Sequence, residues 1–245
     1  MKTLRTLFVA LIVMAAVPMS AQTADEILQN YFENTGGAEA WSKLKGAKMI
    51  GSANAQGMEI PIEMYQMADG KQLLKINIQG QEMTQYAFDG ETMWTTNFMT
   101  MLPEKSDAEA TENMKKNVGD FPSPFLNYKD KGYTVEYLGK ETKEGTETFK
   151  LKLTMKPVMV DGKEEPNVSF FYFDTENYVP IMSESPIPSG PAKGQMAESN
   201  FSDYQEVDGL YFPFSISMQG QGITMKEIVL NPEVEATFFA FPEEK

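Results

Sequence analysis

Acidic side chains are the only residues present in numbers that could carry acid–base chemistry. The 245-residue chain has 35 Asp and Glu but no Cys and no His. This excludes Ser-His-Asp and Cys-His nucleophiles, zinc or haem sites built on those side chains, and disulfides. A glycosidase-like pair of carboxyl groups is the remaining option. The acids closest in sequence are Asp203, Glu206 and Asp208, and Asp174 with Glu176. They lie at the ends of expected strands, where turn and surface roles are more common, so we assign no catalytic residue.

Motifs for metal or nucleotide binding are also missing from the sequence. It has no calcium loop, P-loop, dinucleotide fingerprint or nucleophile elbow. Residues 219–222 (Gln-Gly-Gln-Gly) resemble a phosphate loop but lack the helix that must follow it. We therefore expect no metal, no cofactor and no enzymatic activity.

The informative excess is in methionine and aromatic residues. The chain has 18 Met, 16 Phe, 10 Tyr and 2 Trp. Methionine is flexible and polarizable, and it often lines surfaces that accept variable apolar ligands. On the inner face of a large curled sheet, such residues would form an apolar cavity. The alternative is an ordinary core that uses Met for packing, and the pattern alone leaves both open.

The N-terminus has the pattern of a cleavable secretory signal. Lys2 and Arg5 precede an apolar run over residues 7–17, and small residues follow up to Ala21. The run is shorter than the roughly 20 residues that span a bilayer. No Cys follows it, so the bacterial lipoprotein route cannot attach lipid there. We expect residues 1–21 to be removed and the mature protein to be periplasmic.

The mature chain is strongly acidic. Loss of Lys2 and Arg5 changes the formal net charge from −14 to −16 and removes the only Arg. Nucleic acids and anionic lipid surfaces attract clustered Lys and Arg, so we expect no nucleic-acid partner. The acidity is typical of a soluble exported protein.

Two helices should open the mature chain. Thr23 and Glu26 form a capping box, and Ile27 and Leu28 begin a helical apolar stripe that ends at 36–37 (Gly-Gly). A short second helix is expected over about 39–45. From residue 47 the apolar period changes to two, which predicts strands. Four Asp-Gly pairs lie between the alternating runs, as tight antiparallel hairpins require: Asp69-Gly70, Asp89-Gly90, Asp161-Gly162 and Asp208-Gly209.

One long interruption separates the strands that end near Phe98 and begin near Tyr133. Residues 106–109 (Ser-Asp-Ala-Glu) have the form of a second capping box, which predicts a helix to about Asn117. A turn-rich apolar segment follows over 121–125. Such a long connection in a compact β domain is usually a lid, a binding loop or a plug. We therefore expect a helical lid insertion near 103–127.

These elements indicate an α+β fold built on one antiparallel sheet. About a dozen hairpin-linked strands must curl or close, because flat open sheets of that size are rare. The helices would cover one mouth or one face. The result is either a container with a lid or a filled barrel.

A series of short motifs, in order along the chain, carries a resemblance to a known family. They are Thr23-Ala-Asp-Glu-Ile-Leu with Tyr31 and Gly36-Gly37, Gly57 to Pro61, Ala87 to Thr92 with Trp94, Tyr128 to Tyr133, Tyr172 to Pro180, and Phe201 to Pro213. On these stretches the sequence resembles LolA-like outer-membrane lipoprotein-sorting proteins, in the form common in Bacteroidota.

The resemblance implies a single LolA-like domain over 22–245. Its fold would be a curved, unclosed antiparallel β-barrel of about eleven strands capped by short helices. The apolar interior would shelter lipoprotein acyl chains, which such monomeric carriers take from an inner-membrane lipoprotein exporter and pass to an outer-membrane acceptor. One departure concerns the lid. Well-studied carriers hold it shut with an Arg at the mouth, and this mature chain has no Arg.

Strand parity selects the residues that we expect to line the cavity. Parity shows only which apolar residues share a face, and the choice of face is a hypothesis. The expected lining residues are Ile60, Ile62, Met64, Leu74, Ile76, Tyr86, Phe88, Trp94, Phe98, Phe149, Leu151 and Leu153.

Three functions remain as alternatives. The first is a periplasmic carrier of lipid or lipoprotein acyl groups. The second is a non-catalytic periplasmic sensor or interaction module with the same fold. The third is a secreted hydrolase that works through two carboxylates, for which no motif argues.

Overall fold

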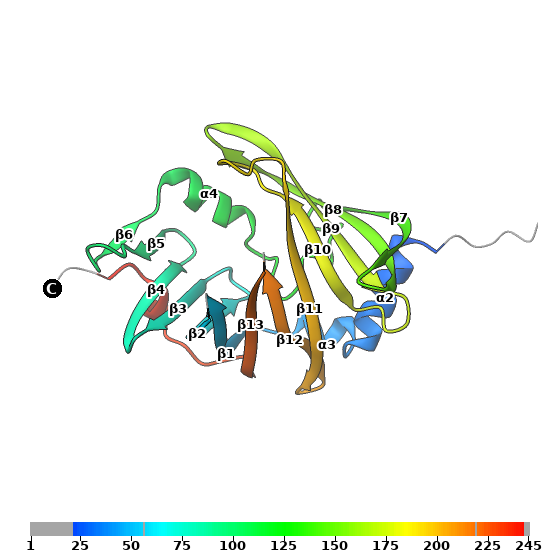
Figure 1. The fold of residues 1–245 in the computed structure, drawn as a ribbon, viewed down its shortest axis with the longest axis horizontal. Helices are drawn as coiled ribbons and strands as arrows, with labels where there is room; N and C mark the ends of the chain where they lie inside the picture. The colour runs from blue at the N-terminus through cyan, green and yellow to red at the C-terminus, as the bar shows by residue number, and fades with distance from the viewer. Residues whose placement is uncertain (1–21, 56, 219, 243–245) are drawn as a thin grey trace, which may run out of the picture.

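One large antiparallel sheet forms the protein (Figure 1). The structure is a computed structural model that describes residues 22–55, 57–218 and 220–242. The expected signal peptide therefore lies outside the described residues. The sheet has 13 strands in the order β6-β5-β4-β3-β2-β1-β13-β12-β11-β10-β9-β8-β7. It is strongly curved, as a sheet of this size must be to bury one face.

Nearly all strands follow one another as hairpins. Their bounds are β1 Gly46–Ala55, β2 Met58–Met67, β3 Gln72–Ile78, β4 Gln81–Phe88, β5 Met93–Thr96, β6 Pro103–Lys105, β7 Thr134–Lys143, β8 Thr146–Val160, β9 Lys163–Asp174, β10 Pro180–Pro186, β11 Met196–Val207, β12 Leu210–Met218 and β13 Gln221–Leu230. All four Asp-Gly pairs lie between paired strands, as predicted.

The sheet is joined through its middle and open at its edges. β1 pairs with β13, with Ala47 opposite Leu230, so the first and last strands lie side by side at its centre. The edge strands β6 and β7 pair with only one neighbour each among the described strands. The predicted unclosed half-barrel is therefore confirmed, with 13 strands instead of about eleven.

The N-terminal helices follow the predicted pattern closely. Helix α2 spans Ala24–Asn34, and its capping box is present: the Thr23 side chain accepts from the Glu26 amide, and the Glu26 side chain accepts from the Thr23 amide. Helix α3 spans Ala38–Ser42, shorter than the expected 39–45. The C-terminal segment adds a 3-10 turn, η2, over Ala236–Phe239.

The middle insertion differs from the prediction in two respects. Residues 103–105 form the short edge strand β6 and are not part of a lid. Helix α4 spans Ala108–Lys116, and its N-cap is Asp107, whose side chain accepts from the Ala110 amide at 2.7 Å. The expected Ser106 capping box does not form. Glu109 instead binds backbone amides of the β8–β9 turn, a tertiary partner that local spacing cannot reveal.

Two apolar clusters divide the concave face of the sheet. The larger one lies between β7–β9, helices α2 and α3, and the segment 121–133. A second cluster lies on β12 and β13 with neighbouring side chains of β1 and β2. A third cluster forms on the opposite, convex face, where residues 234–241 pack over β2–β5. The helices and the middle segment thus fill one half of the barrel and leave the other half less covered.

Candidate functional site

The less covered half of the concave face carries seven of the twelve expected lining residues. Residues directly opposite in an antiparallel pair share a face, and Met64 lies opposite Leu74, which lies opposite Tyr86. Ile62 lies opposite Ile76 on the same face. The set is completed by Ile60, which alternates with Ile62, and by Phe88, which lies opposite Gln72. We call the concave face of β1–β4 and β12–β13 the open half.

Burial in the open half is incomplete. Ile60, Met64, Leu74, Ile76 and Tyr86 are half-buried, whereas Ile62 and Phe88 are buried. Apolar side chains that stay half-buried on a concave wall form a surface that an apolar ligand can cover.

The three expected residues of β8 lie on the same concave face in the other half. Phe149, Leu151 and Leu153 are at most 3% exposed and pack in the larger cluster with Ile27 and Phe125. We call this region the closed half. Its side chains are core residues beneath helix α2, so a ligand could reach them only if α2 or the segment 121–126 moved away.

Trp94 and Phe98 lie elsewhere. Trp94 is opposite Ala87 on the convex face, and its indole N–H donates to the Phe239 carbonyl at 3.0 Å. Phe98 follows the end of β5 in the turn before β6 and is 54% exposed. Neither side chain therefore joins the open half. Alternation along β5 divides its residues between two faces but does not distinguish the faces. It could therefore not show that the C-terminal segment covers the face that carries Trp94.

Two cavities open on the concave side. One, of about 480 Å³, is lined by Gln66 and Gln72 of β2 and β3, Asn117 and Asp120 after α4, and Met155, Val158 and Asn167 of β8 and β9. The other, of about 220 Å³, is lined by Tyr31, Trp41, Met49, Phe171, Phe201 and Phe212 among others. Residues 121, 122 and 124 line both, so the two cavities adjoin across this turn-rich segment.

None of the twelve predicted residues lines either cavity. Met49, Phe171, Phe201 and Phe212 come from four different strands. Alternation marked their strands, but only the β1–β13 pairing brings the first strand beside the last ones. A local pattern could not provide that long-range neighbour.

Burial shifts the pKa values of three polar groups around the cavities. Burial raises the pKa of the Tyr31 phenol to about 12 and the pKa of Tyr204 well above its ordinary value. Burial also raises the pKa of the Asp120 carboxyl, against the opposing effect of a 2.8 Å hydrogen bond from the Tyr133 hydroxyl. The site therefore offers apolar surface beside neutral phenol groups, which suits an acyl chain.

Hydrogen bonds attach helix α4 to the sheet. None of its residues is buried. The Asn113 amide makes two 2.7 Å hydrogen bonds to the backbone of Met159, and Glu109 accepts from the amides of Asp161 and Gly162 at 3.0 and 2.8 Å. Lys116 donates to the Pro157 carbonyl at 2.7 Å. These contacts join α4 to the β8–β9 hairpin.

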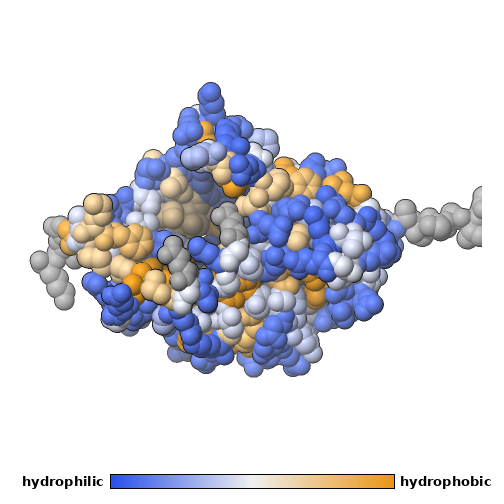
Figure 2. Space-filling view, in the orientation of Figure 1, coloured by the Kyte–Doolittle hydropathy of each residue, from blue (hydrophilic) through white to orange (hydrophobic). Residues whose placement is uncertain are grey.

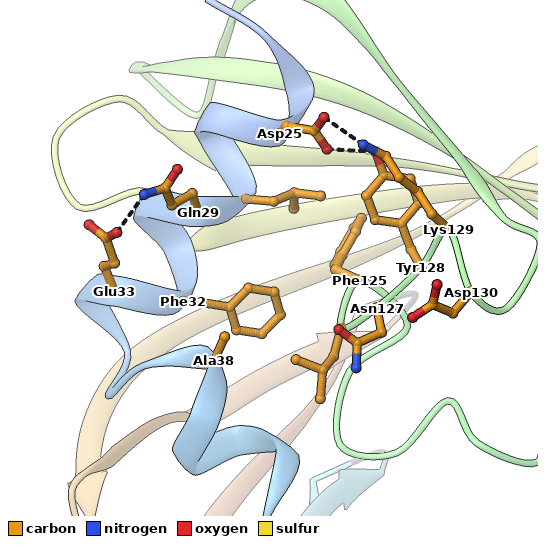
Figure 3. Close-up of a pocket in the computed structure, with 12 residues that line it drawn as sticks. Asp25, Gln29, Phe32, Glu33, Ala38, Phe125, Asn127, Tyr128, Lys129 and Asp130 are labelled. Carbon is orange, nitrogen blue, oxygen red and sulfur yellow. Dashed lines mark hydrogen bonds and ion pairs between the residues drawn. The ribbon is translucent and has the colours of Figure 1, made fainter.

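A separate groove lies on the outside, between α2 and residues 125–130 (Figure 3). Its volume is about 570 Å³. Asp25 accepts from the Lys129 ammonium at 2.7 Å and from the Tyr128 hydroxyl at 2.8 Å, which ties α2 to the segment across the groove. Phe32 and Phe125 form part of its floor and belong to the larger cluster. The groove is thus the outer surface of the closed half.

Potential metal ligands form no cluster in the part of the chain that the structure describes. Within residues 22–55, 57–218 and 220–242, no group of three or more acidic side chains is placed to hold a metal ion. Asp174, one of the acids considered from the sequence, accepts from the amides of Glu176 and Asn177 and closes a turn. In the same described residues, no helix is long and apolar enough to cross a membrane.

Comparison with known proteins identifies the fold. Neither a family model nor a curated protein sequence matches the chain. Among solved structures it is similar to a LolA superfamily protein from Nitrosomonas europaea, with a TM-score of 0.54 and 14% identity over 90% of this chain and 98% of the other. It is also similar to a domain described as an outer-membrane lipoprotein-sorting protein from Vibrio parahaemolyticus, with a TM-score of 0.52 and 12% identity over 87% and 94%. The LolA-like fold expected from the sequence motifs is therefore confirmed.

Proposed function

We propose that this protein is an exported, non-catalytic carrier that shelters acyl chains of lipoproteins or other lipids in its open half. The observation that carries the proposal is the row of half-buried apolar side chains on β2–β4, beside two adjoining cavities that open on the same concave side. The LolA-like fold supports it. The signal-like leader suits a periplasmic route between an inner-membrane exporter and an outer-membrane acceptor.

The driving force for binding is burial of methylene groups. Each CH₂ removed from water is worth about 0.8 kcal/mol, so even part of an acyl chain would bind firmly. The same burial would cover apolar surface of the open half that otherwise stays in contact with water. No reaction is needed for this activity.

Release requires that the covering elements move. No Arg is present after residue 5, so an Arg cannot hold a lid shut in this chain. We assign the lid role to α4, which forms hydrogen bonds to Met159, Asp161 and Gly162. The neutral hydrogen bonds of Asn113 are worth about 0.5–1.5 kcal/mol each, and those to the Glu109 carboxylate about 1.5–3 kcal/mol each, which together still permit opening.

The protein should act as a monomer. An exposed sheet edge can pair with another chain unless it is short or irregular. The edge strand β6 has only three residues and begins with Pro103. The other edge, β7, has a register shift between Tyr137 and Gly139. Light scattering coupled to size exclusion should therefore give the mass of one chain.

The test is native mass spectrometry with lipid extraction on protein purified from a periplasm without detergent. We expect bound mass at a one-to-one ratio that extracts as acyl lipid or lipopeptide. The variants Met64→Gln and Ile76→Asn put polar groups on the open wall, and we expect each to weaken uptake of a fluorescent fatty acid about five- to tenfold. Both positions are half-buried, so the fold should persist.

The matched control is Leu138→Gln on the edge strand β7, where the side chain is 48% exposed. This change removes apolar surface outside the open half, so uptake of the fluorescent fatty acid should stay unchanged. A lipid-free protein that takes up no fatty acid would contradict the carrier and leave the sensor alternative, tested by a protein partner retained after delipidation.

A further inference from the structure

Two sets of connections in the sheet differ sharply in charge. At one end, four neighbouring connections contain no Asp, Glu, Lys or Arg: residues 55–58, 78–81, 97–102 and 218–221, of which 56 and 219 lie outside the described residues. We call these four connections the uncharged rim. The other two connections at this end carry charges, Asp161 between β8 and β9 and Lys193 between β10 and β11. At the opposite end, the turns after β2, β4, β7, β9 and β11 each contain an acid, namely Asp69, Asp89, Glu144, Glu176 and Asp208. In a chain with 35 acidic residues, four neighbouring charge-free connections need a physical reason.

The four connections are neighbours along the sheet. The order β6-β5-β4-β3-β2-β1-β13-β12 places the β5–β6, β3–β4, β1–β2 and β12–β13 connections side by side. Ala53 lies opposite Ile223, which joins the β1–β2 and β12–β13 connections, and Ile62 lies opposite Ile76, which joins β2 and β3. The Thr84 amide of β4 donates a hydrogen bond to the Thr96 hydroxyl of β5. The rim is therefore one continuous border and not four scattered turns.

Large apolar side chains of the rim face water. The exposed fractions are 55% for Met58, 54% for Phe98, 92% for Met99, 62% for Leu102 and 47% for Met218. Figure 2 shows apolar surface over β5 and β6 at the left, beside a hollowed apolar region in the middle of this face. Contiguous exposed apolar surface of this kind indicates a binding surface.

Two of the acids next to the rim form ion pairs, and Glu104, behind the 97–102 connection, accepts from the Asn97 side-chain amide at 2.8 Å. Glu59, next to Met58, binds Lys226 at 2.9 Å, and Glu82, next to the 78–81 connection, binds Lys75 at 2.9 Å. Pairing lowers the net field at the rim of an otherwise strongly acidic protein. A binding partner that carries no net charge suits such a border.

Apolar rows lead from the rim into the open half. On β2, Met58 is followed on the same face by Ile60, Ile62 and Met64. On β3 the row is Ile78, Ile76 and Leu74, and on β12 it is Met218, Ile216, Phe214 and Phe212. We call these rows the apolar ladders. Each one connects exposed rim residues with the concave wall without a polar interruption on that face.

We propose that the uncharged rim docks on the surface of a zwitterionic lipid bilayer, with Phe98, Met99 and their neighbours inserted shallowly among the lipids. This rests on the proposed carrier function and adds the place where cargo enters or leaves. An acyl chain could then move between bilayer and open half along the apolar ladders without crossing water, which removes the largest barrier to its transfer.

A bilayer suits this border better than a folded protein does. Lipids fill the gaps between neighbouring side chains of the rim, whereas a protein partner must match their shape. The flexible methionine side chains adapt to a fluid surface. The formal charge of −16 after loss of residues 1–21 also predicts a preference for zwitterionic over anionic lipids, because anionic lipids should repel the protein.

The test is vesicle flotation of the mature protein. We expect it to float with phosphatidylcholine vesicles and to float less as phosphatidylglycerol is added. The double variant Phe98→Glu with Met99→Glu should lower the partition coefficient about tenfold or more. The control Leu138→Glu changes a similarly exposed apolar residue on β7 and should leave it unchanged. Melting temperatures should show that all three proteins stay folded.

Three outcomes would overturn the docking proposal: no flotation of the unaltered protein, equal loss in the control, or stronger flotation with anionic lipid. No flotation would assign the rim to a protein partner instead. The carrier function is tested separately, by measuring the lipid bound to the purified protein. Bound lipid without flotation leaves the carrier and removes the docking surface, whereas flotation without bound lipid or fatty-acid uptake removes the carrier.

Discussion

Trp94 shows how one hydrogen bond places a side chain on a particular face. Its indole N–H reaches the Phe239 carbonyl, and its ring contacts Phe241 edge-on at 6.0 Å. Tyr65 packs against Phe238 and Phe239 in the same cluster. The C-terminal segment thus covers the convex face of β2–β5, and Trp94 anchors it.

The first residue-scale prediction concerns Trp94→Phe. The change removes the donor to the Phe239 carbonyl and part of a ring that is 5% exposed, so we expect the free energy of unfolding to fall by about 1–3 kcal/mol. Urea unfolding measures it. Fatty-acid uptake should not change, because Trp94 lies on the convex face. A loss of uptake at unchanged stability would show that the side chain contacts the ligand.

The second prediction concerns the pH dependence of stability at Asp120. Burial raises the pKa of this carboxyl above its ordinary 3.8, while Tyr133, Lys131 and Lys156 act to lower it. The folded protein therefore binds more protons than the unfolded chain between the two pKa values. Asp120 thus lowers the free energy of unfolding as pH rises through that window above 3.8.

Asp120→Asn keeps an acceptor for the Tyr133 hydroxyl and removes the titration. We expect the variant to gain stability relative to the unaltered protein when pH rises from about 4 to 7, measured as melting temperature across that range. A difference that stays constant with pH would mean that the carboxyl titrates normally in the folded state, and a reversed trend would mean that its pKa is lowered there. Tyr133→Phe serves as a control for the hydrogen bond alone.

Helix α4 is the element whose stability should differ most from that of the whole sheet. It has no buried residue, its last turn carries Lys115 and Lys116, and Lys115 pairs with Glu112 and Glu91 on the surface. Such exposed pairs contribute little. The half-buried hydrogen bonds of Asn113 to Met159 are therefore the main attachment of α4 to the β8–β9 hairpin.

The element-scale prediction is that Asn113→Ala loosens α4 without unfolding the sheet. Loss of two hydrogen bonds should lower the local opening free energy by about 1–3 kcal/mol and speed amide exchange in 108–116 about ten- to a hundredfold. Hydrogen exchange with mass spectrometry measures it, with Glu112→Ala as the control on the exposed side. Unchanged exchange in α4, or equal acceleration throughout β8, would contradict the role of Asn113.

At the scale of the whole molecule, the two tryptophans lie on opposite sides of the sheet. Trp41 lines the smaller cavity, packs in a tilted arrangement on Phe212 with ring centroids 4.9 Å apart, and donates from its indole to the Thr35 carbonyl at 3.0 Å. Trp94 lies on the convex face under the C-terminal segment. The pair can therefore report which side of the sheet a ligand occupies.

The whole-molecule prediction uses a fatty acid that carries a collisional quencher. We expect it to quench Trp41 and to spare Trp94, so Trp94→Phe, which retains only Trp41, should show the larger fractional quenching. Fluorescence titration measures both proteins. Equal fractional quenching would mean that the ligand does not select the concave side, and preferential quenching in the unaltered protein would place it near Trp94.

Local signals determined much of this protein by themselves. The absence of Cys and His excluded whole classes of chemistry, the Thr23–Glu26 box began helix α2, and the four Asp-Gly pairs placed four hairpins. Alternation grouped the apolar residues of β2, β3 and β8 that share a face of the sheet. These features depend on neighbours within a few residues, or on the two-residue period of a strand, so the sequence contains them in full.

Only the tertiary structure decided which apolar face meets water and which is covered. The same alternation describes Leu151, buried beneath α2, and Ile76, half-buried on the open wall. The β1–β13 seam, the C-terminal segment over Trp94 and the binding of Glu109 to the β8–β9 turn join residues far apart in the chain. Alternation along a strand shows which residues share a face, but it does not show which face is covered. Long-range packing decides which face is covered, and no local spacing specifies it.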